Sequence, residues 1–182
     1  MSIASEIAII ATLAYPDAVS LSPEVYQSLC PRNSHDIVGL QSVSSVFTLG
    51  ALLAISGGAL RVWCYRVLGS LFTYEVTLRP AHTLVRQAPY NTVRHPSYTA
   101  LILQAIGTIA VLFSPGAWSR ECGIMHTKAG PFVILWPMGV AYTCVSVWRR
   151  GALEDDLLRK RFGSVWEEYA REVPWKFFPW IA

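Results

Sequence analysis

Three long stretches of the 182-residue chain contain no Asp, Glu, Lys or Arg: residues 37–60, 96–119 and 129–148. A helix that crosses the hydrocarbon core of a bilayer takes about 20 predominantly apolar residues. Charged residues make up 15% of the chain, against roughly 25% in soluble domains. Thirteen of the 27 charged residues follow Trp148. These features predict an all-α, polytopic transmembrane helical protein and exclude a disordered chain.

The expected organisation is one membrane domain over residues 1–182. Ser114-Pro115-Gly116 interrupts the second charge-free stretch and shortens its span. The N-terminal apolar run before Pro16 would rise only about 12 Å as a helix, so it stays open whether 3–14 crosses the membrane, lies on it or packs inside. Because this region has no basic residues and carries Glu6, we expect no cleavable signal peptide. The expected spans are 37–60, 98–113 and 129–148, with a partial span at 3–14 left open and an amphipathic C-terminal helix over 150–172.

The distribution of arginines orients these spans. Residues 61–94 contain five arginines and one glutamate, whereas residues 15–36 contain three acidic residues and one arginine. Lys and Arg accumulate in short cytoplasmic loops. The loop before His95 and the charged C-terminal segment are therefore both expected on the cytosolic side, where one cofactor pocket could draw on both.

Several classes of site are not expected. A net charge of +3 without a basic, aromatic stripe does not indicate nucleic-acid binding. The Rossmann, P-loop, HExxH and GxSxG signatures are absent from the sequence. The four cysteines show neither CxxC spacing nor histidines at metal-ligand intervals. We therefore expect scattered thiols in a reducing or membrane setting and no metal.

Residues 82–98 form a polar, turn-rich approach to the second span. Pro89 and Pro96 restrict the residues before them to extended conformations. Hydrogen-bonding and ionisable side chains at a membrane entry are candidates for function. The alternative is an interfacial belt, with Tyr90 and Tyr98 at headgroup level and Arg94 extending to water. Physical chemistry alone leaves both interpretations open.

Residues 150–169 carry the second candidate group. Arg150 and Glu154 are four residues apart, so they share one helix face beside the end of the last span. The alternative is a solvated, salt-bridged helix next to the membrane. An apolar face at approximate helical spacing would contact the membrane or neighbouring helices: Leu153, Leu157, Phe162, Trp166 and Tyr169.

Four phrases in these segments form a recognisable pattern: His82-Thr-Leu-Val, Pro-Tyr90, Val-Arg-His95-Pro-Ser-Tyr98-Thr and Arg150-x3-Glu154-Asp155-x2-Leu158-x3-Phe162-Gly163-x2-Trp166-x2-Tyr169-x3-Val-Pro. Taken together, they resemble the signature of the isoprenylcysteine carboxyl methyltransferase family. The resemblance covers about residues 74–179 and implies a multi-pass enzyme of the endoplasmic reticulum membrane whose active site faces the cytosol. Its cofactor would be S-adenosyl-L-methionine, and it would methylate the C-terminal carboxylate of prenylcysteine or of prenylated CaaX-type proteins.

The resemblance also assigns roles by position. Arg150 would bind the substrate carboxylate, and Arg150 and Glu154 would form the catalytic pair. Three positions depart from the family pattern: Glu75, where relatives contribute an amide, and Ala88 and Ala100, where glycine is usual. The residues implied in cofactor binding are His82, Thr83, Leu84, Val85, Tyr90, His95, Pro96, Ser97, Tyr98 and Glu154.

Two other functions remain open from the sequence. A methyltransferase of the same fold could act on a phospholipid amine or another lipid-soluble acceptor. An amine acceptor, however, favours acidic groups where this chain has Arg150. The other alternative is a non-catalytic relative that retains the membrane scaffold.

Overall fold

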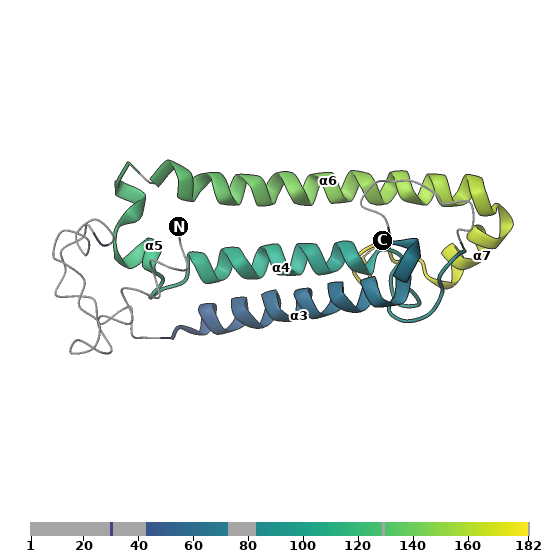
Figure 1. Ribbon diagram of the computed structural model, residues 1–182, viewed down its shortest axis with the longest axis horizontal. Coiled ribbons are helices and arrows are strands. Elements are labelled where there is room, and N and C mark those ends of the chain that lie inside the picture. The colour runs from purple at the N-terminus through teal and green to yellow at the C-terminus, as the bar shows by residue number, and fades with distance from the viewer. Residues whose placement is uncertain (1–29, 31–42, 73–82, 129, 182) are drawn as a thin grey trace. The chain divides into compact units, whose positions relative to one another are not determined.

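The computed structural model describes residues 30, 43–72, 83–128 and 130–181 (Figure 1). His82, Glu75 and the expected partial span 3–14 lie outside the described residues. Within the described residues the regular elements are helices, apart from an isolated bridge between Phe178 and Ile181, which confirms the all-α prediction. The helices, labelled as in Figure 1, are α3 (Ser45–Leu68), η2 (Gly69–Leu71), α4 (Pro96–Leu112), α5 (Trp118–Glu121), η3 (Ile124–His126), α6 (Gly130–Phe162) and α7 (Ser164–Glu172).

Two helices are long and apolar enough to cross a membrane. They are Ser45–Leu71, which combines α3 with η2, and α6. Only 11% of the apolar window in each is buried, so their apolar side chains face outward, unlike those of a soluble core helix. The expected span 98–113 corresponds to α4, an apolar helix of 17 residues. Such a helix rises only about 25 Å, somewhat less than the roughly 30 Å of a hydrocarbon core.

α3 extends beyond the expected end of its span at Leu60. Ser44 begins the helix, because its Oγ accepts a hydrogen bond from the backbone N–H of Phe47 at 3.2 Å. The helix continues through Arg61 and Arg66 to Leu68. Arginine has a high helix propensity and a long side chain that can carry its charge away from an apolar zone. The charges therefore limit the apolar window without ending the helix.

α6 also differs from the expected boundary between the last span and the C-terminal helix. The last span and the first part of the expected 150–172 helix form one continuous helix, which ends at Phe162. Its 33 residues rise about 50 Å, so the charged last third extends beyond an apolar layer of about 30 Å. The break lies instead at Gly163, whose positive φ of 54° allows the chain to turn into α7.

The chain divides into two compact units. The first contains Met1–Leu52 and Gly107–Gly139. Within it, Cys30 and Cys122 form a disulfide across 92 residues of sequence. The expectation of scattered thiols is therefore wrong for this pair, whereas Cys64 and Cys144 are free. Such a pairing depends on how loops distant in sequence pack, which spacing does not reveal.

The second unit contains Leu53–Ile106 and Val140–Ala182. Gly57 of α3 packs closely on α4, since a Cβ at Gly57 would lie 2.7 Å from the carbonyl oxygen of Ala100. Ala100 itself is fully buried. The small residue at this contact is thus supplied by α3. Among the described non-glycine residues, only Trp180 has a positive φ. Neither Ala88 nor Ala100 therefore adopts a backbone conformation that requires glycine.

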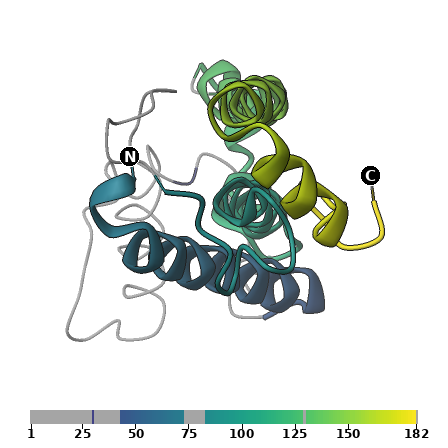
Figure 2. The same ribbon diagram turned by 90° about the vertical axis from the view of Figure 1, so that its right-hand side faces the viewer.

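The C-terminal part of the second unit returns to the beginning of α4. After α7 the chain runs back, and the carbonyl groups of Trp175 and Lys176 accept hydrogen bonds from the backbone of Arg94 and His95, directly before α4 (Figure 2). Trp166, Tyr169 and Val173 form a buried cluster there, against which Leu84 packs. This arrangement unites the two polar segments that the sequence singled out.

Candidate active site

A cavity of about 340 Å³ lies within the second unit. This volume falls in the range of roughly 300–1,000 Å³ typical of small-molecule sites. Pro96, another predicted cofactor residue, is fully buried as the first residue of α4. The predicted site residues that line the cavity come from the 83–98 segment and from α6: Thr83, Leu84, Val85, Tyr90, His95, Ser97, Tyr98, Arg150 and Glu154.

His95 joins the two segments. Its imidazole is 6% exposed and lies between two neighbouring carboxylates of α6. Nε2 is 2.9 Å from Oδ1 of Asp155, and Nδ1 is 3.4 Å from Oε2 of Glu154. Both ring nitrogens therefore face acceptors, an arrangement that suits a protonated imidazole donating on both sides.

The pKa of His95 reflects these contacts. Burial lowers the pKa of the imidazole, but its hydrogen bonds to Asp155 and Glu154 and their charges outweigh burial, so the pKa stands above the ordinary value of 6.5. The direction of the shift indicates that the folded protein favours the imidazolium. The two carboxylates thus stabilise the protonated form of His95.

Asp155 is a central residue that the sequence interpretation did not single out. Its carboxylate is buried and pairs with His95 through Oδ1 and with Nη2 of Arg94, at 3.3 Å, through Oδ2. Arg94 also donates to the carbonyl oxygen of Val173 at 3.4 Å. The available signal was the Glu154-Asp155 dipeptide in the motif, but only packing shows that both carboxylates meet the Arg94-His95 pair.

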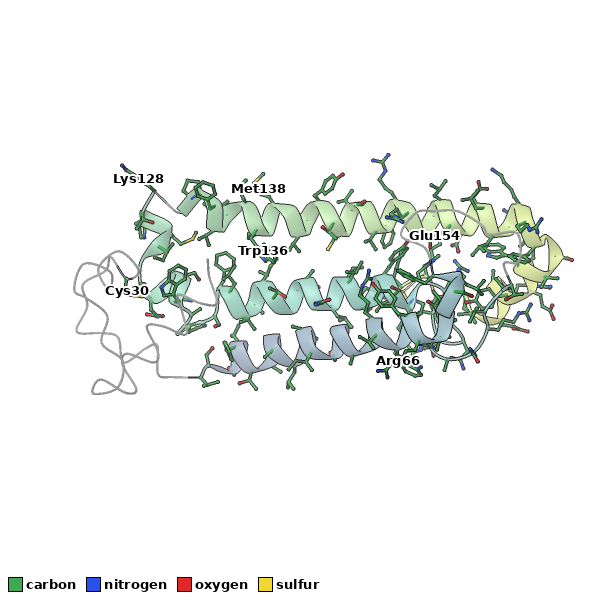
Figure 3. All side chains as sticks on the ribbon, in the orientation of Figure 1. Cys30, Arg66, Lys128, Trp136, Met138 and Glu154 are labelled. Carbon is green, nitrogen blue, oxygen red and sulfur yellow. A yellow bond between two sulfur atoms is a disulfide. The ribbon has the colours of Figure 1, made fainter. Side chains whose placement is uncertain are left out.

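Glu154 lies on the side of α6 that faces α4 (Figure 3). The hydroxyl of Tyr98, in the first turn of α4, donates a hydrogen bond to Oε1 of Glu154. Arg150, one turn earlier on α6, interacts electrostatically with the same hydroxyl. Arg150, Glu154 and Tyr98 thus place a cation, an anion and a phenol at one wall of the cavity.

Arg61 contributes a second cation from α3. Its Nη1 donates to the carbonyl oxygen of Ser97 at 3.2 Å and to Ser97 Oγ at 3.1 Å. The guanidinium also lies 4.9 Å from the ring centroid of Tyr65, a cation–π distance. One signal for this residue was present in the sequence, because Arg61 directly follows a charge-free stretch.

The loop before α4 is held against α7 by a hydrogen bond from Tyr169 and by the contacts of Arg86. The hydroxyl of Tyr169 donates to the carbonyl oxygen of Tyr90 at 2.8 Å. Burial raises the pKa of Tyr169 to about 12, against a lowering by Arg94, so the hydroxyl keeps its proton near neutral pH. Arg86 lies over the ring of Tyr169 and pairs with Glu168 and Glu172 of α7. These contacts hold the Tyr90 turn against α7.

The site combines charges of both signs with an apolar opening. Leu68, Leu71, Phe72 and Leu101 add apolar walls. Tyr142 lines the cavity yet is 76% exposed, so the cavity reaches the surface on the apolar part of α6. Within the described segments, no group of three or more His, Cys, Asp or Glu side chains is arranged to hold a metal ion.

A comparison with protein families agrees with the motifs at this site. Residues 49–125, which include the Tyr90 turn and the His95 segment, match the model of the isoprenylcysteine carboxyl methyltransferase (ICMT) family. Over these residues the chain is therefore similar to the ICMT family. Further matches to curated members of the isoprenylcysteine carboxyl methyltransferase family extend over about 70–75% of the chain.

Three relatives illustrate the extent of the similarity. Protein-S-isoprenylcysteine O-methyltransferase B of Arabidopsis thaliana is 28% identical over 75% of this chain and 61% of its own length. The human protein-S-isoprenylcysteine O-methyltransferase is 28% identical over 74% of this chain and 42% of its length. The Delta(14)-sterol reductase TM7SF2 of Mus musculus is 28% identical over 50% of this chain and 18% of its length.

The chain spans about two fifths to three fifths of the length of the methyltransferases it matches. No solved structure matches the chain significantly.

Proposed function

We propose that this protein uses S-adenosyl-L-methionine to methylate the C-terminal carboxylate of prenylated cysteine. The observation that carries the proposal is the shared cavity: the 83–98 segment and the Arg150–Glu154 pair, more than 50 residues apart, line the same space. The similarity to the ICMT family supports the reaction class. The proposed catalytic pair is Arg150 and Glu154, with Arg150 binding the substrate.

The acceptor needs alignment and partial desolvation more than a base. A prenylcysteine carboxylate is already ionised near pH 7. The guanidinium of Arg150 can bind it in a planar fork without losing its proton. The apolar walls around the cavity would exclude water from the reacting oxygen. Arg150 therefore orients the nucleophile, and the walls remove part of its hydration.

The residues present fit the proposed cofactor. When bound, S-adenosyl-L-methionine supplies a methyl group on a positively charged sulfur. Glu154 offers an anion to the cationic part of such a ligand, and Arg61 and Arg94, which also line the cavity, offer partners for its carboxylate. The loop at Thr83–Val85, together with Tyr90, His95, Ser97 and Tyr98, would hold the remainder. His82 stays a proposed cofactor residue. Pro96 would contribute as the first residue of α4, which places the residues after it.

The prenyl chain would enter from the lipid. Tyr142 marks the place where the cavity meets the exposed apolar surface of α6. Burial of each CH₂ of such a chain contributes about 0.8 kcal/mol. We propose a multi-pass arrangement that includes α4 as a shorter span, in the endoplasmic reticulum membrane, with the cavity facing the cytosol. The arginine excess of residues 61–94 supports this orientation.

Two assays on detergent-solubilised protein test the proposal. Isothermal titration with S-adenosylhomocysteine should show specific binding. Transfer of a labelled methyl group should occur to a farnesylcysteine analogue and not to phosphatidylethanolamine. Transfer to the amine alone would establish the lipid-headgroup alternative, and binding without any transfer would favour a non-catalytic relative.

The match to a sterol reductase supports a second candidate, a reductase of lipid-soluble substrates. That match covers half of this chain, so the shared region is compatible with more than one chemistry. Titration with a reduced nicotinamide dinucleotide, performed beside the S-adenosylhomocysteine titration, separates the two. Binding of the dinucleotide alone would replace the methyltransferase proposal.

A further inference from the structure

The C-terminal residues 175–177 lie directly against the segment that carries His95. The backbone N–H of Arg94 donates to the carbonyl oxygen of Trp175, and the N–H of His95 donates to that of Lys176, both at 2.9 Å. The hydroxyl of Thr99 donates to the carbonyl oxygen of Phe177. Three consecutive carbonyl groups thus bind the beginning of α4. We call residues 175–177 the C-terminal strap.

Phe177 fixes the strap against α6. Phe177 is 3% exposed. Between centroids, its ring lies 5.1 Å from the ring of Trp148 and 5.7 Å from the imidazole of His95. It packs directly over Gly151: a Cβ there would lie 2.7 Å from Cζ and 3.1 Å from Cε1 of Phe177. The same Cβ would lie 3.5 Å from Cδ2 of His95. Gly151 therefore provides the space that the Phe177 ring occupies, whereas His95 lies at ordinary contact distance from this position.

We propose that Phe177 and Gly151 are positioning residues, which together hold His95 between Glu154 and Asp155 and so shape the cofactor cavity. This inference takes the identity of the ligand from the proposed function. The contacts among Phe177, Gly151 and His95 do not depend on which reaction is catalysed. The reasoning is steric. His95 is bound along its backbone by the strap, and the Phe177 ring of the strap can lie this close to α6 only because position 151 has no side chain. A methyl group at position 151 would displace the strap and carry His95 away from its two carboxylates.

The first test is the variant Gly151→Ala, with Gly139→Ala on the same helix as its control. A Cβ at Gly139 has no atom within 4 Å outside its immediate helix neighbours. Displacement of a binding group by about 1 Å can cost on the order of a hundredfold. We therefore expect Gly151→Ala to weaken S-adenosylhomocysteine binding by about tenfold to a hundredfold and Gly139→Ala to leave it unchanged.

The second test is a suppressor. Leucine at position 177 lacks the outer ring atoms Cε1 and Cζ that a methyl group at position 151 would meet. The double variant Gly151→Ala/Phe177→Leu should therefore bind S-adenosylhomocysteine more tightly than Gly151→Ala alone. A double variant that binds no better, or a Gly151→Ala protein that binds like wild type, would overturn the steric argument.

A third measurement does not require a ligand. NMR titration of histidine-labelled protein, with the His95 signal assigned by its loss in His95→Asn, reports the imidazole directly. The charged groups around the ring are Glu154 and Asp155 from α6 and the adjacent Arg94. The titratable phenol of Tyr98 in α4 stacks on the imidazole at 5.7 Å between centroids, and the strap contributes the uncharged ring of Phe177.

The histidine titration also separates the two proposals. In Gly151→Ala the midpoint for His95 should fall towards 6.5, because the imidazole leaves its carboxylates, and the double variant should restore part of the wild-type value. An unchanged midpoint would refute the positioning role even if the protein binds no S-adenosylhomocysteine. Conversely, failure of wild-type protein to transfer a methyl group, with the His95 result as expected, would refute only the proposed reaction.

Discussion

Replacement of Asp155 by Asn should be far more damaging than the same replacement at its neighbour Asp156. Asp155 is buried and contacts both His95 and Arg94. Asp156 is half exposed and pairs with the exposed Lys160 at 2.6 Å across one helical turn. The two aspartates therefore provide a matched comparison within one helix, with the same chemical change at each.

The magnitude follows from burial. Arg94 is only 9% exposed, and removing one partner of a buried ion pair costs about 3–5 kcal/mol. For a chain of this size, each 1 kcal/mol lowers the melting temperature by about 2–4 °C, which gives a decrease of about 6–20 °C. An exposed pair one helical turn apart contributes only about 0.3–0.5 kcal/mol, so Asp156→Asn should lower the melting temperature by no more than about 2 °C.

The pH dependence gives the same comparison a second readout. The pKa of His95 in the folded protein lies above its ordinary value. Its contribution to stability is therefore fully present below pH 6.5 and is lost as the pH rises through the pKa of the folded state. Asp155→Asn removes one of the two carboxylates whose hydrogen bonds raise this pKa, so the loss of stability across this pH window should become smaller.

Thermal unfolding in detergent, followed by tryptophan fluorescence between pH 5 and 9, measures both effects. S-adenosylhomocysteine binding provides the functional readout, and we expect it to weaken for Asp155→Asn only. Similar melting temperatures for the two variants at every pH would refute the reasoning, because they would show that Asp155 does not carry a buried ion-pair network.

Three further predictions concern the substrate, the helix contact and the disulfide. Arg150→Ala should abolish methyl transfer to a farnesylcysteine analogue while largely preserving S-adenosylhomocysteine binding; equal loss of both would refute its assignment to the substrate. Gly57→Ala should destabilise the protein by about 1–3 kcal/mol, since the added methyl group meets α4 backbone atoms, whereas Gly58→Ala, which meets nothing within 4 Å, should be neutral or stabilising in the same melting assay. Non-reducing peptide mapping of protein from sealed microsomes should find Cys30 linked to Cys122, protected from a membrane-impermeant reductant added outside; ready reduction would contradict the proposed orientation.

Much of the candidate site could be predicted because its residues carry local signals. Arg150 and Glu154 are one helical turn apart, so any helix places them on one face. The turn around Tyr90 and the start of α4 at Pro96 follow from proline and from the polar composition before an apolar run. Asp155 gave no comparable signal. It lies next to Glu154, and its partner His95 is 60 residues away.

The amino-acid sequence by itself determined the helical class, the apolar segments and the residue types available for chemistry. Charge distribution and helical periodicity are local properties, so they can be recognised in the amino-acid sequence alone. Tertiary structure alone decided that His95 lies between two carboxylates, that Cys30 pairs with Cys122, and that Phe177 fits over Gly151. Each of these contacts joins segments 26 to 92 residues apart, and its free energy depends on close packing, where a single methyl group changes the outcome.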